Sequence, residues 1–218
     1  KMFAEGQAAI PAKGIGQIPL QLKNKLTNTE IRLNTKVKKV DTVVHLENGE
    51  TLIANKIVIA TQPEALIKGL DDKPNFQSVI NMYFQSQESL INKPTIGLVA
   101  KETLFINNFH EVSQLATNKN SNQKLISVSI NDDVKVDAEA IISELAQLTG
   151  IETTNLEHIQ TYKIDRALPI VDDLKNEMQH TEVKLNDNIF LAGDYLLNGS
   201  LNAAMKSGRI AAQAVLAS

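Results

Sequence analysis

The sequence predicts an α+β protein that contains two kinds of β-structure. Two short continuous apolar runs, at 57–60 and 189–191, are typical of strands covered on both faces, as in a parallel sheet flanked by helices. Between them lie five short runs with partial alternation, which favour an antiparallel sheet with one face buried. We therefore expect an incomplete α/β-type layer, built discontinuously from residues 1–70 and 166–218, and a mixed or antiparallel sheet domain with helices over residues 71–165.

Bulk composition excludes several classes of function. The chain has 218 residues and a net charge of -3, which argues against a nucleic-acid surface. It has no cysteine, so a disulfide framework, a thiolate metal site and a cysteine nucleophile are all excluded. The histidines lack HxH or HExxH spacing and no G-x-S-x-G occurs, so we expect neither a metal site nor a serine hydrolase.

Every apolar run is much shorter than the roughly 18 residues that a membrane-spanning helix needs. We expect a cytoplasmic location, with peripheral membrane attachment of the complete protein as the alternative.

The first seventy residues predict a helix, a hairpin and two further strands. Pro19 suits the first turn of a helix whose apolar residues recur every four positions, at Ile18, Leu22 and Leu26. Alternation at 31–33 predicts a strand, and Asn48-Gly49 predicts a hairpin turn between the runs 43–46 and 52–53. The buried strand at 57–60 then leads into a short helix that begins near Pro63 and stops at Gly69.

The middle of the chain predicts five strands and one helix. The strands correspond to the runs 79–84, 95–100, 104–109, 125–130 and 159–164. Asp137 can cap a helix that Gly150 ends, and Ile141, Ile142, Leu145 and Leu148 form its buried face. The Asn- and Ser-rich segment 113–121 predicts a loop or flap.

The last thirty residues predict a strand, a polar loop and a capped helix. Gly193 ends the strand at 189–191, Asp194 opens the loop, and Ser200 is a good N-cap. Small residues at nearly four-residue spacing predict that the helix packs closely on its neighbour: Ala204, Gly208, Ala211 and Ala212, followed by Val215. This arrangement directs free backbone N–H groups and a partial positive charge toward an electron-rich ligand.

This strand-loop-helix unit resembles the C-terminal cofactor-binding signature of the FAD-dependent amine oxidase and phytoene desaturase superfamily, which also contains protoporphyrinogen oxidases. The resemblance implies that Gly193 and Asp194 lie beside the FAD pyrophosphate and ribityl chain, with Asp194 accepting a ribityl hydroxyl and the adjacent N–H groups facing phosphate. The helix start at Ser200, Leu201 and Asn202 would point at the flavin.

Residues 31–61 resemble a second superfamily segment, which implies that the backbone of Val37 meets the adenine end of FAD. In the same comparison, Ala60 and Thr61 end a strand near the cofactor. We interpret Tyr195 as a packing residue, with a place at the border of the flavin as the alternative. Arg166 is interpreted as a surface or salt-bridging residue, with a side chain that reaches into a pocket as the alternative.

The resemblance implies an FAD-dependent oxidoreductase that moves a hydride equivalent from a small, hydrophobic substrate to flavin, with 71–165 as the substrate-binding domain. Amines, polyenes and porphyrinogens are not distinguished, and neither the catalytic residues nor the electron acceptor is identified. A non-catalytic binding or assembly module that keeps the fold is the alternative.

The superfamily's N-terminal GxGxxG unit is absent from these residues, so the chain matches the C-terminal half of a family member. We therefore expect that FAD is held by the complete protein and not by these 218 residues alone. Without the missing half, the edges of the strands at 57–60 and 189–191 are open and favour a homodimer or strand addition.

Overall fold

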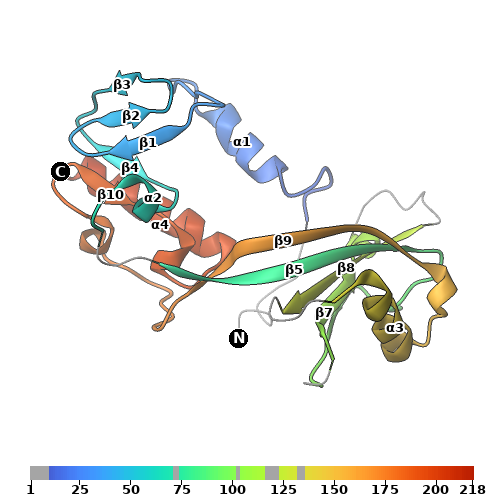
Figure 1. Cartoon of the computed structure of the whole chain (residues 1–218). Coiled ribbons are helices and arrows are strands. Elements are labelled where there is room, and N and C mark those ends of the chain that lie inside the picture. Colours follow the sequence, from blue (N-terminus) through green and yellow to red (C-terminus); the bar gives the residue numbers. More distant parts are fainter. Residues whose placement is uncertain (1–9, 71–73, 102–103, 116–122, 132–135) are drawn as a thin grey trace. The chain divides into compact units, whose positions relative to one another are not determined.

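The computed structural model describes residues 10–70, 74–101, 104–115, 123–131 and 136–218, and it confirms the α+β class (Figure 1). The chain divides into two compact units. The first contains residues 10–29 and Ser78–Asp165, and the second contains Glu30–Gln77 and Arg166–Ser218. Residues 10–29 thus group with the middle of the chain, whereas the sequence assigned them to the incomplete α/β layer. The functional roles of the two parts stay predictions.

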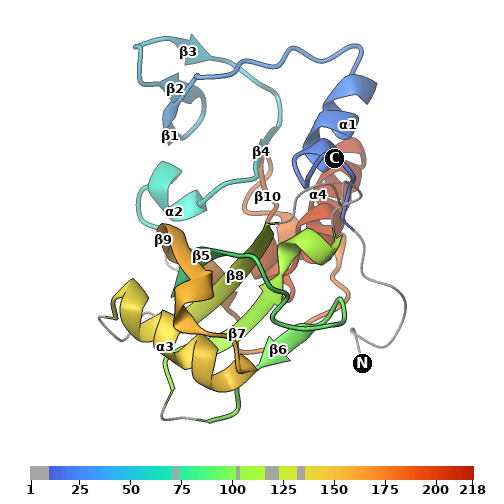
Figure 2. The same cartoon turned by 90° about the vertical axis from the view of Figure 1, so that its right-hand side faces the viewer.

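The first unit is organised around a five-stranded sheet with the order β6-β7-β8-β5-β9 (Figure 2). The pairs β5/β8, β6/β7 and β7/β8 are antiparallel. The five predicted runs are therefore confirmed as strands of one sheet, with these bounds: β5 Asn75–Ser86, β6 Ile96–Leu98, β7 Ile106–Glu111, β8 Lys124–Asn131 and β9 Leu156–Ile170.

Helix α3, Ala138–Thr149, supplies side chains to the core of this sheet. As predicted, Asp137 caps the helix by accepting the Ala140 N–H at 2.9 Å, and Gly150 ends it at φ 77°. Ile141 and Leu145 are fully buried, whereas the prediction that Leu148 is buried is wrong, since it is 39% exposed. The predicted loop at 113–121 begins as a 3-10 turn, Val112–Leu115, and its residues 116–121 lie outside the described part.

Helix α1, Gln17–Lys25, forms where the sequence predicts it, and Pro19 lies in its first turn. None of its residues is buried, and Leu22 remains 48% exposed. Its apolar stripe therefore contributes nothing to the core formed by the described residues.

In the second unit, an antiparallel sheet contains β1 (Val37–Val40), β2 (Val44–Leu46) and β3 (Thr51–Leu52). The predicted hairpin is confirmed, with Gly49 at φ 90° in its turn. The strand predicted at 31–33 is wrong, because Asn34 adopts φ 54° in a turn and the strand begins only at Val37.

The second unit also holds a two-stranded parallel sheet, in which β4 (Ile57–Ile59) pairs with β10 (Ile189–Leu191). Ile59 and Ile189 are buried in a small core with Val40. Val58 is 43% exposed, so the expectation that both faces of β4 are covered is wrong for the residues described. Helix α2, Pro63–Leu66, follows β4 after the three residues 60–62, and it ends before the predicted stop at Gly69.

Helix α4, Leu201–Leu216, packs beside β10 through small side chains. The predicted small-residue stripe is offset by about one position: Ala203, Ser207, Ile210, Ala211 and Ala214 are the buried residues. Gly208, by contrast, has no atom within 4 Å of where a Cβ would stand. Small residues occur on two neighbouring faces of this helix, and the sequence alone did not identify which one is buried.

Within the described ranges, no helix combines the length and apolar character needed to cross a bilayer. The same ranges contain no group of three or more His, Asp or Glu side chains placed to hold a metal ion.

Candidate cofactor site

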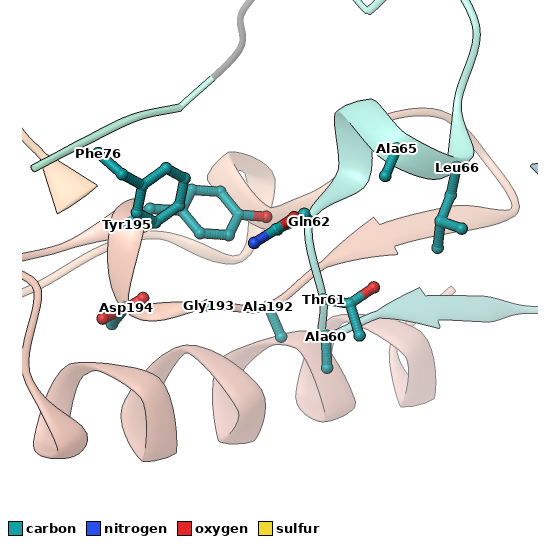
Figure 3. Close-up of a pocket in the computed structure, with 10 residues that line it drawn as sticks. All are labelled: Ala60, Thr61, Gln62, Ala65, Leu66, Phe76, Ala192, Gly193, Asp194 and Tyr195. Atoms are coloured by element: carbon teal, nitrogen blue, oxygen red, sulfur yellow. The ribbon is translucent and has the colours of Figure 1, made fainter. Parts of the chain in front are cut away.

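A cavity of about 360 Å³ opens where the two parallel strands β4 and β10 end (Figure 3). Both strands run in the same direction, so their carboxyl ends meet at one edge, which is where open α/β sheets bind ligands. Two segments and one distant residue line the cavity: Ala60, Thr61, Gln62, Ala65 and Leu66 after β4, Ala192, Gly193, Asp194 and Tyr195 after β10, and Phe76.

The backbone of Gly193 is held by a hydrogen bond to helix α4. Its N–H donates to Ser207 Oγ at 3.0 Å, and the buried Ser207 hydroxyl in turn donates to Ala204 O within α4. This N–H is therefore already used by the protein, contrary to the expectation that the N–H groups next to Asp194 face phosphate.

The absent side chain of Gly193 matters because of its neighbour. A Cβ there would stand 2.2 Å from Tyr195 Cε1, far inside van der Waals contact. Since Gly193 has an extended backbone at φ 168°, space and not backbone conformation requires glycine here.

The start of α4 is capped as predicted. Ser200 Oγ accepts the Ala203 N–H at 3.1 Å and donates to Asn198 Oδ1 at 2.7 Å. The Asn198 amide then donates to Lys175 O and Asn176 Oδ1, both at 3.1 Å, so the turn before the helix is anchored. Leu201 and Asn202 follow as exposed residues.

The cavity brings together only some of the predicted cofactor-binding residues. Gly193 and Asp194 line it, whereas Ser200, Leu201 and Asn202 are not among its lining residues. Val37 is half-buried on β1 beside the small core of Val40 and Ile59. The proposed contacts of these residues with FAD stay predictions.

Sequence reasoning did not find Gln62, Ala65, Leu66 or Phe76, and it favoured packing over a flavin contact for Tyr195. Phe76 stands at the start of β5, more than one hundred positions before Gly193, and no local pattern links the two. For Gln62 a signal did exist, because it directly follows the Ala-Thr pair at the end of the predicted buried strand.

An ion pair stands next to the cavity. Arg166 Nη2 lies 2.7 Å from Glu64 Oε1, and the guanidinium lies 4.8 Å from the centre of the Phe76 ring. The salt-bridging interpretation of Arg166 is confirmed. The contact to Glu64 is ionic and lacks hydrogen-bond geometry, so both buried carboxylate oxygens have no hydrogen-bond partner among the described residues.

Tyr195 is neutral at physiological pH. Burial raises the pKa of its hydroxyl to about 12, with further contributions from the negative charges of Glu64 and Asp194. The hydroxyl therefore stays a proton donor, and it too lacks a partner within the described part of the chain.

Comparison with known proteins identifies a family for the chain. Residues 2–216 match the family described as flavin containing amine oxidoreductase. A search of curated proteins gave no match.

Several solved structures share the fold. A reduced UDP-galactopyranose mutase superposes with a TM-score of 0.71 at 11% identity, over 96% of this chain and 53% of the mutase. Wild-type putrescine oxidase bound to putrescine gives 0.64 at 13% identity, over 94% of this chain and 53% of the oxidase. An oxidoreductase from Methanosarcina mazei superposes with a TM-score of 0.58 at 14% identity, over 96% of this chain and 55% of the oxidoreductase. The chain thus spans about half the length of these proteins.

Proposed function

Because the chain belongs to the family of flavin-containing amine oxidoreductases, we propose that it forms the C-terminal part of an FAD-dependent oxidoreductase of desaturase or amine-oxidase type. When bound, FAD supplies the redox chemistry by accepting a hydride equivalent from a C–H or C–N centre of the substrate. The observation that carries the proposal is the cavity at the carboxyl ends of β4 and β10, with Gly193 and Asp194 in its lining.

The residues of this cavity fit part of a flavin cofactor. Ala60, Ala192 and Gly193 carry at most a methyl group, so a ligand can approach the strand ends closely. Asp194 can accept a hydrogen bond from a ribityl hydroxyl. No Lys or Arg among the described residues lines the cavity, which favours an uncharged part of FAD here and leaves the diphosphate to residues outside this lining.

The start of α4 would act on the flavin by electrostatics. Leu201 and Asn202 are exposed residues that follow the Ser200 cap, and their backbone N–H groups carry the partial positive charge of a 16-residue helix. Against negative charge on a reduced flavin, such a helix end contributes about 0.3–1 kcal/mol when exposed.

The first unit is our candidate for the substrate-binding part. Ile96 and Leu98 on β6 are 51% and 79% exposed, which supports a small, hydrophobic substrate. No side chain in the unit is assigned a catalytic role. Comparing amines, polyenes and porphyrinogens as substrates would identify the class.

An open strand edge supports a partner for the second unit. Among the described residues, β4 pairs only with β10, so its other edge is unpaired, whereas β10 also forms an isolated antiparallel bridge between Phe190 and Lys184. Such edges favour strand addition, either by the family's nucleotide-binding half or by a second copy in a homodimer.

The test is to express the protein with any coding sequence that precedes Lys1 and to measure its flavin content and its visible absorption during substrate screening. We expect stoichiometric FAD that bleaches with one substrate class, and little FAD in residues 1–218 alone. A full-length protein that fails to bind added FAD would support the non-catalytic assembly module instead.

A further inference from the structure

Tyr195 presents a hydroxyl that the protein itself does not satisfy. The oxygen is shielded from solvent and has no hydrogen-bond partner among the described residues. Native proteins pair nearly all buried polar groups, and an unpaired one lowers the stability of the folded state. Such a group therefore calls for a partner that is not part of the polypeptide described.

The position of the hydroxyl identifies where that partner enters. The Tyr195 ring packs against Gly193 in the cavity lining, and its oxygen points toward the Gln62 side chain (Figure 3). Gln62 is an exposed residue on the segment between β4 and α2. An exposed side chain can change rotamer without backbone movement, so a ligand that fills the cavity can displace Gln62 from over the hydroxyl.

The charges around Tyr195 restrict the chemistry of the ligand atom. Asp194 lines the cavity, the Glu64 carboxylate acts on the hydroxyl from α2, and the part of the lining that the structure describes contains no Lys or Arg. Arg166 pairs with Glu64, but no ion pair to Asp194 occurs among the described residues, so a phosphate oxygen placed here would meet the Asp194 charge. An uncharged oxygen can accept from the neutral phenol, and a hydroxyl can also donate to Asp194.

We propose that Tyr195 Oη donates a hydrogen bond to an uncharged oxygen of FAD, either a ribityl hydroxyl or a ring carbonyl. Gln62 is the side chain that the cofactor displaces. This inference rests on the proposed function. Tyr195 is then a cofactor-binding residue and not only a packing residue.

The matched variants are Tyr195→Phe and Tyr83→Phe in the full-length protein. Tyr83 lies on β5 in the first unit, edge-on to Tyr162 at 5.9 Å, so it controls for loss of a phenolic hydroxyl elsewhere. We expect Tyr195→Phe to raise the melting temperature of the cofactor-free protein, because an unpaired buried hydroxyl is removed. The same variant should weaken FAD binding about threefold to tenfold, measured by flavin fluorescence, whereas Tyr83→Phe leaves FAD binding unchanged.

Three outcomes would overturn the inference. In the first, the wild type binds FAD and the Tyr195→Phe variant binds it equally tightly. In the second, the cofactor-free variant has a lower melting temperature than the wild type, which indicates a structural role. In the third, the variant binds FAD more weakly but binds riboflavin as the wild type does. Since riboflavin lacks phosphate, the acceptor would then be a phosphate oxygen. A wild type that binds no FAD contradicts the proposed function instead.

Gln62→Ala tests the displaced side chain separately. If Gln62 only covers the hydroxyl, FAD binding to this variant is unchanged or tighter. Tenfold weaker binding would show that Gln62 itself holds the cofactor and would overturn its role as a cover.

Discussion

Buried carboxylates are treated differently in the two units. In the first unit, Glu144 accepts the N–H groups of Phe105 and Ile106 at 2.9 and 3.1 Å, and Glu111 accepts from Ser89, Ser113 and Gln114. In the second unit, neither oxygen of Glu64 has a hydrogen-bond partner within the described residues.

The Tyr195 hydroxyl shares this condition, so three buried oxygens without a hydrogen-bond partner occur in or next to one cavity, of which Glu64 Oε1 is ion-paired with Arg166. Outside it, the corresponding exception among the described residues is Gln114 Oε1. Within the described residues, the first unit is thus close to complete in its buried side-chain polar contacts, while the unpaired oxygens at the strand ends of β4 and β10 support the proposal that a cofactor binds there.

The largest expected effect comes from removing the hydrogen-bonded carboxylate of Glu144. Glu144→Ala leaves the Phe105 and Ile106 N–H groups without their acceptor, and each buried unpaired group costs about 1–3 kcal/mol. We expect about 2–4 kcal/mol lower free energy of unfolding, measured by urea denaturation. Glu64→Gln should cost less than about 1 kcal/mol, since it removes an ion pair whose arginine is 38% exposed. Equal losses would contradict the contrast between the two units.

The next effect concerns Gly193. In Gly193→Ala the new Cβ collides with the Tyr195 ring, so we expect about 1–3 kcal/mol of destabilisation and loss of FAD binding. Gly208→Ala is the matched control, because it faces open space inside α4 and should stabilise the helix by about 0.5–1 kcal/mol. Thermal unfolding of both variants would decide, and destabilisation of the same size in both would show that the ring contact is not the cause.

A smaller effect is expected at the two helix caps, one in each unit. Ser200→Ala and Asp137→Ala each remove a side-chain acceptor for a first-turn N–H, at a cost of about 1 kcal/mol. Only the Ser200 variant should also weaken FAD binding. Ser200→Thr keeps the hydroxyl and should retain both stability and binding, so loss of either in the Thr variant would exclude the cap as the reason.

The smallest effect is a pH dependence that comes from Tyr195. Its folded pKa of about 12 lies above the unfolded value of 10.0, so the folded state keeps a proton that the unfolded state loses. This contribution to stability is fully present below about pH 10 and is lost as the pH rises toward about 12. Urea unfolding should show a shallower decline over that window in Tyr195→Phe than in Tyr83→Phe. Parallel profiles would mean that the Tyr195 pKa is not raised.

Local signals predicted much of this fold. The caps Asp137 and Ser200, the Asn-Gly hairpin and the five alternating runs all depend on residues close together in sequence, and each appears where it was expected. The strand at 31–33 failed because the turn at Asn34 outweighed two alternating apolar residues.

The site was predicted only in part, for a physical reason. Gly193 and Asp194 belong to one contiguous motif, but Phe76 reaches the cavity from another strand through tertiary packing. The unpaired state of the Tyr195 hydroxyl likewise depends on what surrounds it in three dimensions and has no sequence pattern.

Amide hydrogen exchange of the full-length protein with and without FAD tests the central claim most directly. We expect FAD to slow exchange in the two cavity segments, 60–66 and 192–196, and to leave exchange in β7 and β8 of the first unit unchanged. Unchanged exchange at both cavity segments in a protein that demonstrably binds FAD would contradict it.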